Sequence, residues 1–272
     1  MRDKLNKQPI GIFDSGVGGL TVFKEIRKLF PFEDIVYFGD TARVPYGPKS
    51  PRTVVDYSIQ NARFLMQCGA KIIVVACNTS SAVALPELQK KIPVPVIGVI
   101  EPGSISAISA TINNRIGVIG TEGTIRSKAY ADAIYKIAPD IQVFSQACPL
   151  FVSLAEEGWE DHDVTKLVIA EYLENLLTKN IDTLVLGCTH YPILKKPIGD
   201  FAGSNIKLVD SAEAVTHQLL KILPDPETEV NGQDRFYVSD NEQKFMKIAS
   251  RILEKEIKNL INVKLGESWY IS

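Results

Sequence analysis

The stretches IIVVACNTSSAVAL, residues 72–85, and LVLGCTHYPIL, residues 184–194, share one organisation. Each begins with a short apolar run and continues with a small residue, a cysteine and a polar pair, where a helix can begin. A buried strand followed by a helix is the repeating unit of a parallel α/β sheet. Because Cys77 and Cys188 hold the same place in the two stretches, the sequence predicts an α/β fold that contains this unit twice.

Three further pairs of segments, each separated by nearly the same number of residues, support an internal duplication. They are IGIFDSG (10–16) with IGVIGTE (116–122), DIVYF (34–38) with DIQVF (140–144), and Ile100-Glu101 with Val209-Asp210. Strand ends often look alike, but matched pairs in one order along the chain indicate a repeated unit. We therefore expect each repeat to form an α/β domain of the same topology.

The predicted architecture is two similar parallel-sheet α/β domains related by pseudo-two-fold symmetry, with the active site in the cleft between them. Residues 1–98 plus 212–272 form the first domain and carry Cys77, and residues 99–211 form the second and carry Cys188. The tail after residue 211 returns to the first domain through a loop that contains Pro224 and Pro226. The chain then crosses between domains near residues 99 and 212.

The apolar periodicity gives the expected elements in detail. Strands are expected at residues 10–13, 35–38, 72–76, 94–100, 115–119, 141–144, 183–187, 207–209 and 235–238. Helices are expected at residues 20–29, 52–67, 81–90, 124–138, 164–179, 212–223 and 241–257.

Composition narrows the class of protein. The 272 residues carry 30 Lys and Arg against 32 Asp and Glu, scattered along the chain, for a net charge of −2. A nucleic-acid-binding protein usually has a clustered basic face, so we expect no nucleic-acid partner. The polar N-terminal residues 1–9 do not resemble a signal peptide, and no apolar run is long enough to span a membrane. We expect a cytoplasmic protein without a membrane partner.

The four cysteines have no spacing typical of metal sites. No Cys-x-x-Cys pair is present and the chain has only 3 histidines, so we expect no metal. Cys68, within a helical apolar pattern, and Cys148, before Pro149, are interpreted as core residues. Cys77 and Cys188 follow strands, where ligands bind in parallel α/β sheets, and are interpreted as reactive thiols.

Two thiols that reach one cleft from opposite sides suit one class of reaction. Inverting a stereocentre by proton transfer requires a base on one face of the carbon and an acid on the other, with the roles exchanged in the reverse direction. A thiol performs either role once a helix N-terminus or a nearby cation lowers its pKa towards neutrality. The duplication would supply the two opposed groups.

Four segments in order along nearly the whole chain resemble the glutamate racemase family, within the aspartate/glutamate racemase superfamily. They are GIFDSGVGGLTV (11–22), YFGDTARVPYGPKS (37–50), VVACNTSSAVAL (74–85) and LGCTHYPIL (186–194). The resemblance implies an isomerase that interconverts L- and D-glutamate by a two-base reaction without a cofactor. Its D-product feeds bacterial peptidoglycan synthesis and so cell-wall biogenesis and cell shape. We also expect a homodimer.

The resemblance implies catalytic roles for Cys77 and Cys188, with Asp14 near the first thiol and His190 near the second. Ser15, Asn78, Thr79 and Thr189 offer hydroxyl, amide and helix-start N–H groups, which bind carboxylates without a formal positive charge, and Asp14 offers a carboxylate for the substrate ammonium. With the residues that the resemblance adds, the expected substrate-binding set is Asp14, Ser15, Tyr46, Gly47, Asn78, Thr79, Thr121, Glu156, Thr189 and His190. Thr121 is the duplicate of Ser15. Either Glu156 or Glu157 could lie near the substrate ammonium.

Two other functions fit part of the pattern. An aspartate racemase would share the fold and the first cysteine motif, but its second motif carries Glu where this chain has His190. A two-lobe amino-acid-binding protein without catalysis would explain the duplication but not the paired thiols. The glycines in GVGG, residues 16–19, lack the spacing of a nucleotide-binding loop. We interpret them as a tight turn that lets backbone approach a small ligand, with no nucleotide cofactor.

Overall fold

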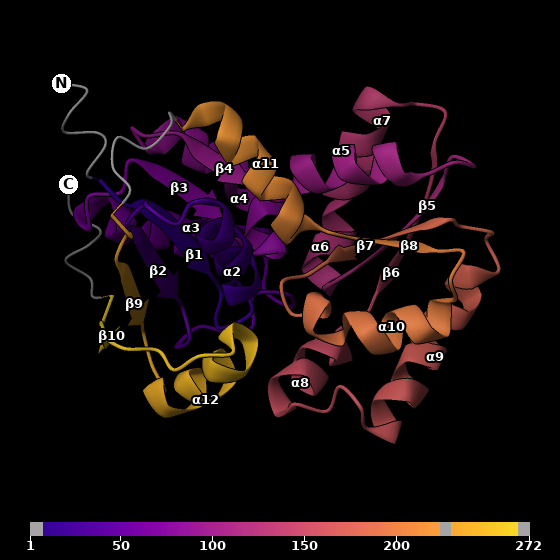
Figure 1. Ribbon diagram of the computed structural model, residues 1–272. Coiled ribbons are helices and arrows are strands. Elements are labelled where there is room, and N and C mark those ends of the chain that lie inside the picture. Colours follow the sequence, from indigo (N-terminus) through magenta and orange to yellow (C-terminus); the bar gives the residue numbers. More distant parts are fainter. Residues whose placement is uncertain (1–7, 224–229, 266–272) are drawn as a thin grey trace.

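The computed structural model describes residues 8–223 and 230–265. The polar N-terminal residues 1–7 and the loop prolines Pro224 and Pro226 lie outside these ranges. The described chain forms two parallel sheets, each covered by helices on both faces, that lie side by side (Figure 1). We call the six-stranded sheet with its helices the first lobe and the four-stranded sheet with its helices the second lobe. The α/β fold expected from the sequence is confirmed.

In the first lobe, the strands lie in the order β10-β9-β2-β1-β3-β4, and every pairing is parallel. The strands are β1 Ile10–Asp14, β2 Ile35–Gly39, β3 Ile72–Val75, β4 Val96–Gly98, β9 Asp234–Val238 and β10 Leu260–Asn262. β9 and β10 come from the C-terminal part of the chain, which therefore returns to the first sheet. β10 has no counterpart in our sequence-based expectations.

In the second lobe, the parallel strands lie in the order β6-β5-β7-β8. They are β5 Arg115–Gly120, β6 Gln142–Ala147, β7 Thr183–Gly187 and β8 Lys207–Asp210. This order repeats β2-β1-β3-β4 of the first lobe strand for strand. The expected likeness of the two topologies is confirmed, and it places β3 and β7 at equivalent positions.

The observed strands correct two of the segment matches on which the internal duplication was based. Ile10 pairs with Ile35 in the first sheet, whereas Ile116 pairs with Val143 in the second. The residue equivalent to Ile35 is therefore Val143 and not Ile141, because β6 begins later than expected. The match of Ile100-Glu101 with Val209-Asp210 is wrong, since β4 ends at Gly98 and Ile100 already begins a helix.

Helices cover both faces of the first sheet. α2 (Leu20–Leu29), α11 (Ser211–Ile222) and α12 (Glu242–Leu253) pack on one face, and α3 (Pro51–Gln67) and α4 (Asn78–Lys91) pack on the other. Alternation along β1 supplies both cores: Ile10 and Ile12 join the first, and Phe13 joins the second.

The second sheet is covered in the same manner. α5 (Ile100–Ala110) and α7 (Ala129–Ile137) lie on one face, and α8 (Leu150–Glu157), α9 (Asp163–Leu177) and α10 (Lys195–Ala202) lie on the other. A short helix, α6 (Glu122–Ser127), follows β5, and a 3₁₀ turn, η1 (Tyr191–Leu194), precedes α10. α5, α8 and α10 were not expected from the sequence.

Two expected helices differ from those observed. The helix expected at residues 124–138 is two helices, because Lys128 adopts a left-handed conformation between α6 and α7. The Ser127 hydroxyl donates to the Thr124 carbonyl and accepts from the Ala129 N–H, which stabilises the break. The helix expected to reach residue 257 ends at Leu253, where Glu254 is left-handed.

The chain passes between the lobes twice. It leaves the first sheet after β4 and enters the second with β5, and it returns after β8 through α11, which packs against both α2 and α5. We propose domain limits of residues 1–98 plus 212–272 and residues 99–211. Truncation at these limits, followed by measurement of cooperative unfolding of each part, tests this division.

Candidate active site

The two thiols lie at equivalent strand ends and face one cavity. Cys77 is the N-cap of α4 and lies one residue beyond Ala76, which follows β3, and Cys188 directly follows β7. Both side chains are buried, and both line a cavity of about 30 Å³. Because two lobes of like topology each contribute one thiol, the thiols reach this space from different lobes.

Most of the expected site residues line this cavity with the thiols. They are Ser15, Tyr46, Gly47, Asn78, Thr79, Thr121, Thr189 and His190. Val44, Pro45 and Val152 also line it and were missed, because apolar residues in a loop and a helix carry no sequence signal for a site. A space of this size holds about one water molecule, so admitting an amino acid requires local movement.

Asp14 lies beside the cavity but does not line it. It ends β1 and is fully buried; its carboxylate accepts hydrogen bonds from the Gly16 N–H at 3.0 Å and the Thr189 hydroxyl at 3.3 Å. Burial raises the pKa of Asp14, while the charge of His190 and these hydrogen bonds oppose the rise. Asp14 is therefore not among the residues that line the cavity, and its expected binding role stays a prediction.

Asp14 and burial together determine the chemistry of the first thiol. Burial and, to a lesser degree, the negative charge of Asp14 together raise the pKa of Cys77 to about 12, against the opposing effect of the hydrogen bond from the Ser80 N–H. That N–H lies 3.5 Å from the sulfur, in the first turn of α4. The expectation of a lowered pKa is therefore wrong for Cys77, because burial and a neighbouring anion outweigh the helix N-terminus; Cys77 is protonated at neutral pH and able to act as an acid.

The glycines of residues 16–19 serve contacts within the protein. A β-carbon at Gly18 would collide with the His190 ring and the Thr189 hydroxyl, and one at Gly19 would collide with Asp14. The turn therefore lets the first lobe approach the second, and its expected approach to a ligand stays a prediction. None of these four glycine-turn residues lines the cavity.

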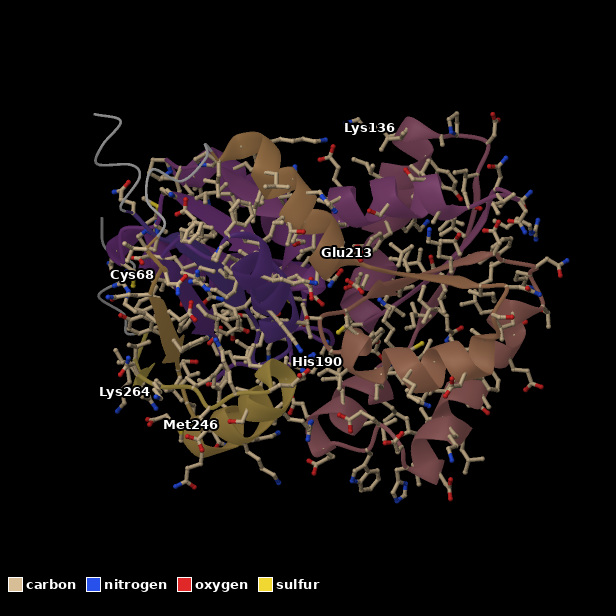
Figure 2. All side chains as sticks on the ribbon, viewed as in Figure 1. Cys68, Lys136, His190, Glu213, Met246 and Lys264 are labelled. Carbon is tan, nitrogen blue, oxygen red and sulfur yellow. The ribbon has the colours of Figure 1, made fainter. Side chains whose placement is uncertain are left out.

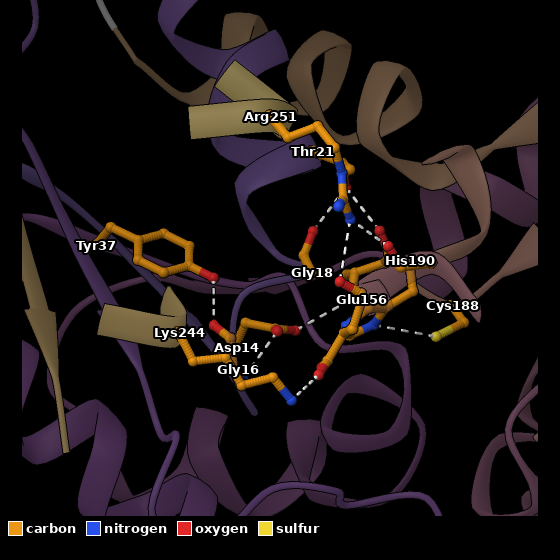
Figure 3. Close-up of polar contacts among 12 residues, drawn as sticks. Asp14, Gly16, Gly18, Thr21, Tyr37, Glu156, Cys188, His190, Lys244 and Arg251 are labelled. Atoms are coloured by element: carbon orange, nitrogen blue, oxygen red, sulfur yellow. Dashed lines mark hydrogen bonds and ion pairs between the residues drawn. The ribbon is translucent and has the colours of Figure 1, made fainter. Parts of the chain in front are cut away.

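His190 occupies the corresponding place beside the second thiol. Its Nδ1 lies 3.9 Å from the Cys188 sulfur, and its Nε2 lies 3.2 Å from Glu156 Oε1 (Figure 3). Burial alone would lower the pKa of His190, but the hydrogen bonds and charges of Cys188 and Glu156 raise it to about 10. His190 is therefore an imidazolium at neutral pH, at the junction of the lobes (Figure 2).

Of the two adjacent glutamates, Glu156 is the one near the site. Its carboxylate binds His190 and Lys244 and does not line the cavity. Burial would raise the pKa of Glu156, but these two cations lower it to about 2. Glu156 therefore lies behind His190, and we find it placed to hold the imidazole rather than a substrate ammonium.

Asn78 presents a donor to the cavity that has no partner. The Tyr130 hydroxyl donates to Asn78 Oδ1 at 2.7 Å, which fixes the orientation of the amide. Asn78 Nδ2 is buried and has no hydrogen-bond partner among the described residues. An unpaired buried donor costs about 1–3 kcal/mol, so this atom favours a ligand that carries an acceptor such as a carboxylate.

Three threonine hydroxyls meet where the lobes face each other. Thr79 Oγ1 lies 2.8 Å from Thr121 Oγ1 and 3.3 Å from Thr124 Oγ1. Thr79 belongs to α4 of the first lobe, and Thr121 caps α6 of the second. Hydroxyls donate or accept according to their rotation, so this cluster can turn donors towards an anion.

A polar network supports the loop that carries Tyr46 and Gly47. The Tyr46 hydroxyl donates to Asp40 and accepts from Asn61 Nδ2 at 3.0 Å, and Arg43 binds Asp40 at 2.7 Å. These supporting residues were not identified from the sequence, because their partners meet only in the fold. Tyr46 thus lines the cavity with its ring while its hydroxyl is occupied.

Within the described ranges, the side chains provide no cluster of three or more His, Cys, Asp or Glu that could hold a metal ion. The same residues include no helix of the length and apolar character needed to cross a membrane.

None of the described residues that line the cavity is Lys or Arg, so an anion there would rely on His190 and on neutral donors.

Two α/β lobes that place one thiol each on a shared cavity define a racemase-like architecture, and comparison with known proteins identifies the family. The model of the Asp/Glu/Hydantoin racemase family matches residues 10–219. A glutamate racemase from Geobacter metallireducens is 53% identical over 260 residues, which cover 94% of this chain and 96% of that protein. The chain therefore belongs to the Asp/Glu/hydantoin racemase family and, within it, to the glutamate racemases, which are isomerases.

Solved structures agree with this assignment. A glutamate racemase isoform from Bacillus anthracis superposes with a TM-score of 0.91 at 40% identity, over 95% of this chain and 98% of that one. The glutamate racemase from Francisella tularensis, solved in complex with D-glutamate, has a TM-score of 0.90 at 42% identity, over 97% and 99% of the two chains.

Proposed function

We propose that this protein interconverts L- and D-glutamate by moving a proton at the α-carbon between Cys77 and Cys188. The observation that carries the proposal is the cavity that both thiols line, each from an equivalent strand end of its lobe. Membership of the glutamate racemases supports the substrate. No cofactor enters the proposed reaction.

The proton transfer balances with these two groups alone. In the L-to-D direction, a Cys188 thiolate takes the α-proton from one face of glutamate, and the Cα–H electron pair remains on the carbon. The Cys77 thiol then gives its proton to the opposite face and becomes a thiolate. Reversal uses the same groups with exchanged roles, as microscopic reversibility requires. The imidazolium of His190 stabilises negative charge on the neighbouring sulfur.

The assignment of Cys188 to L-glutamate and Cys77 to D-glutamate rests on the family resemblance. The charges around the thiols bear on a separate question, which thiol begins as the acid. Cys77 is held in its protonated form, so the resting protein is prepared to donate a proton there. Which enantiomer each thiol faces does not follow from these charges.

The substrate carboxylates are proposed to bind neutral donors. Asn78 Nδ2, the N–H groups at the start of α4 and the threonine hydroxyls surround the cavity. Helix N-termini bind carboxylates through free N–H groups and the helix dipole. Ser15, Gly47, Thr121 and Thr189 are proposed to complete the binding surface.

Incubation with L-glutamate in deuterated water, without any added cofactor, tests the proposal. We expect D-glutamate to form and deuterium to appear at the α-carbon. A two-lobe binding protein would leave the α-hydrogen unexchanged, and exchange of aspartate instead of glutamate would indicate an aspartate racemase. Either result would contradict the proposed function.

The biological role follows from the resemblance. We propose that the D-glutamate produced supplies peptidoglycan synthesis in the cytoplasm, and that the protein acts as a homodimer. Growth of a D-glutamate-requiring bacterium that expresses this chain tests the supply of D-glutamate. Light scattering of the purified protein measures its molar mass and so tests the homodimer.

A further inference from the structure

Helix α12 brings two basic side chains from the first lobe to the end of helix α8 in the second. Lys244 and Arg251 are seven positions apart and therefore share a helix face. Lys244 Nζ lies 2.7 Å from Glu156 Oε2, and Arg251 donates to the carbonyl oxygens of Ala155 and Glu156 (Figure 3). Both contacts join elements that are far apart in the sequence.

Arg251 acts on the backbone of α8. The last carbonyl groups of a helix have no partner within it, and a cation there also interacts favourably with the helix dipole. Gly158 ends α8 with φ of 77°, and a side chain at this glycine would collide with the Arg251 guanidinium. Arg251 therefore fixes the end of α8, next to the residue that contacts His190.

Lys244 contacts the carboxylate of Glu156, which lies near the C-terminal end of α8. Glu156 uses one carboxylate oxygen for Lys244 and the other for His190. A continuous chain of contacts thus runs from Lys244 through Glu156 and His190 to Cys188. The inner end is buried, whereas the Lys244 side chain is 51% exposed. Water would compete for Glu156 if Lys244 were removed.

We propose that Lys244 is a positioning residue that holds the Glu156 carboxylate against His190, so that α12 of the first lobe completes the Cys188 half of the site. The consequence for racemisation rests on the proposed function, but the contact itself does not. Lys244 touches neither the cavity nor a reacting atom. Its effect on Cys188 is transmitted through Glu156 and His190.

Lys244 could act on His190 by holding Glu156 in place or only through its positive charge. The two possibilities predict opposite changes in the pKa of His190 when Lys244 is removed. The charged or titratable groups that act on His190 are Cys188, Glu156 and Asp14, with Lys244 beyond Glu156. If Lys244 acted only as a nearby cation, its removal would favour the imidazolium and raise the His190 pKa. If Lys244 holds Glu156 in place, its removal weakens the Glu156 contact and lowers that pKa from about 10 towards 6.5.

The experiment is an NMR titration of the imidazole groups, which is feasible because the chain has only 3 histidines. The variants are Lys244→Met, which removes the charge, and Lys244→Arg, which keeps a cation that can bind a carboxylate. Lys247→Met removes the same charge from an exposed position on the same helix and is the matched control. We expect the His190 titration midpoint to fall in Lys244→Met only.

Racemisation kinetics complete the test. We expect kcat of Lys244→Met to fall roughly tenfold or more, with activity restored in Lys244→Arg and unchanged in Lys247→Met. A His190 midpoint that stays or rises in Lys244→Met would overturn the positioning role, as would a lowered midpoint with unchanged kcat. If the parent protein did not racemise glutamate, the proposed function would fail while the titration still tested the contact.

Discussion

The surroundings of Cys77 and Cys188 differ in charge although their backbones are equivalent. Cys77 follows β3 and has the buried carboxylate of Asp14 nearby, whereas Cys188 follows β7 and has the His190 imidazolium. The corresponding strands hold the same places in two sheets of the same order. The repeated strand order thus accounts for where the thiols lie, whereas the charged residues beside them differ between the lobes.

This difference places an anion beside one thiol and a cation beside the other. An anion beside a buried thiol favours the proton on sulfur, and a cation beside a thiol favours the thiolate. A racemase needs one acid and one base at the start of each turnover, so an unequal pair suits it better than two identical thiols. The following predictions test whether the two halves are separable in this way.

The largest expected effect is the loss of racemisation when either thiol is replaced. Cys77→Ser and Cys188→Ser should each lower the rate by at least about 10³-fold, because an alcohol is a poor base and acid at neutral pH compared with a thiol. Conversion of L- to D-glutamate is the measurement. Cys68→Ser is the matched control, since Cys68 lies on α3's C-terminal end, away from the cavity. Parental activity in either site variant would refute the equal need for both thiols.

Replacing Asp14 should make Cys77 easier to ionise. In Asp14→Asn the amide removes the negative charge, so the pKa of Cys77 should fall below its parental value of about 12. A Cys188→Ser background isolates Cys77, whose thiolate is the base for elimination from a glutamate analogue with a β leaving group. The kcat/KM of this reaction rises with pH until the thiol is ionised.

In the Cys188→Ser background we therefore expect the pH profile of elimination to level off at a lower pH when Asp14→Asn is added. With Cys188 retained, Asp14→Asn should reduce turnover of glutamate roughly a hundredfold. Asp132→Asn, on the exposed surface of α7, is the control for loss of one negative charge. A profile that moves to higher pH would show that Asp14 does not act on Cys77 through its charge.

A smaller effect is expected at the threonines that join the lobes. Thr79→Ala should raise KM for glutamate about 5- to 30-fold, equivalent to about 1 to 2 kcal/mol, because one hydroxyl leaves the shared cluster with Thr121 and Thr124. Thr189→Ala should have a similar effect and also removes a hydrogen bond to Asp14. Thr178→Ala, exposed at the end of α9, is the control. Unchanged kinetic constants in both would remove these residues from the site.

Local patterns predicted the repeated sheets well. The apolar runs that end at Asp14, before Cys77 and before Cys188 are central strands, and each pairs with the strand that follows it in sequence. The missed helix α5 begins IEPG, and Pro and Gly usually indicate a break. Proline is tolerated in a first helical turn, and Gly103 lets α5 pack against Tyr130. Tertiary packing therefore decided this helix against its local signals.

The site was predicted where residues follow strands and was missed where distant segments meet. Thr79, Thr189 and His190 follow the two cysteines and were identified at once. The choice between Glu156 and Glu157 depended on the phase of α8, which was not expected as a helix. Lys244 lies 88 positions from Glu156, and an exposed lysine on an amphipathic helix has no distinguishing pattern. Such a contact becomes visible only when the lobes are seen together.

The central claim is that each thiol serves one face of the α-carbon. The direct measurement is elimination from the two enantiomers of the β-substituted analogue by Cys77→Ser and Cys188→Ser. In this reaction one thiolate takes the α-proton, the electron pair forms the Cα–Cβ double bond, and the leaving group departs, so the second thiol is not needed. We expect Cys77→Ser to process only the L-enantiomer and Cys188→Ser only the D-enantiomer. Elimination from the same enantiomer by both variants would contradict the account.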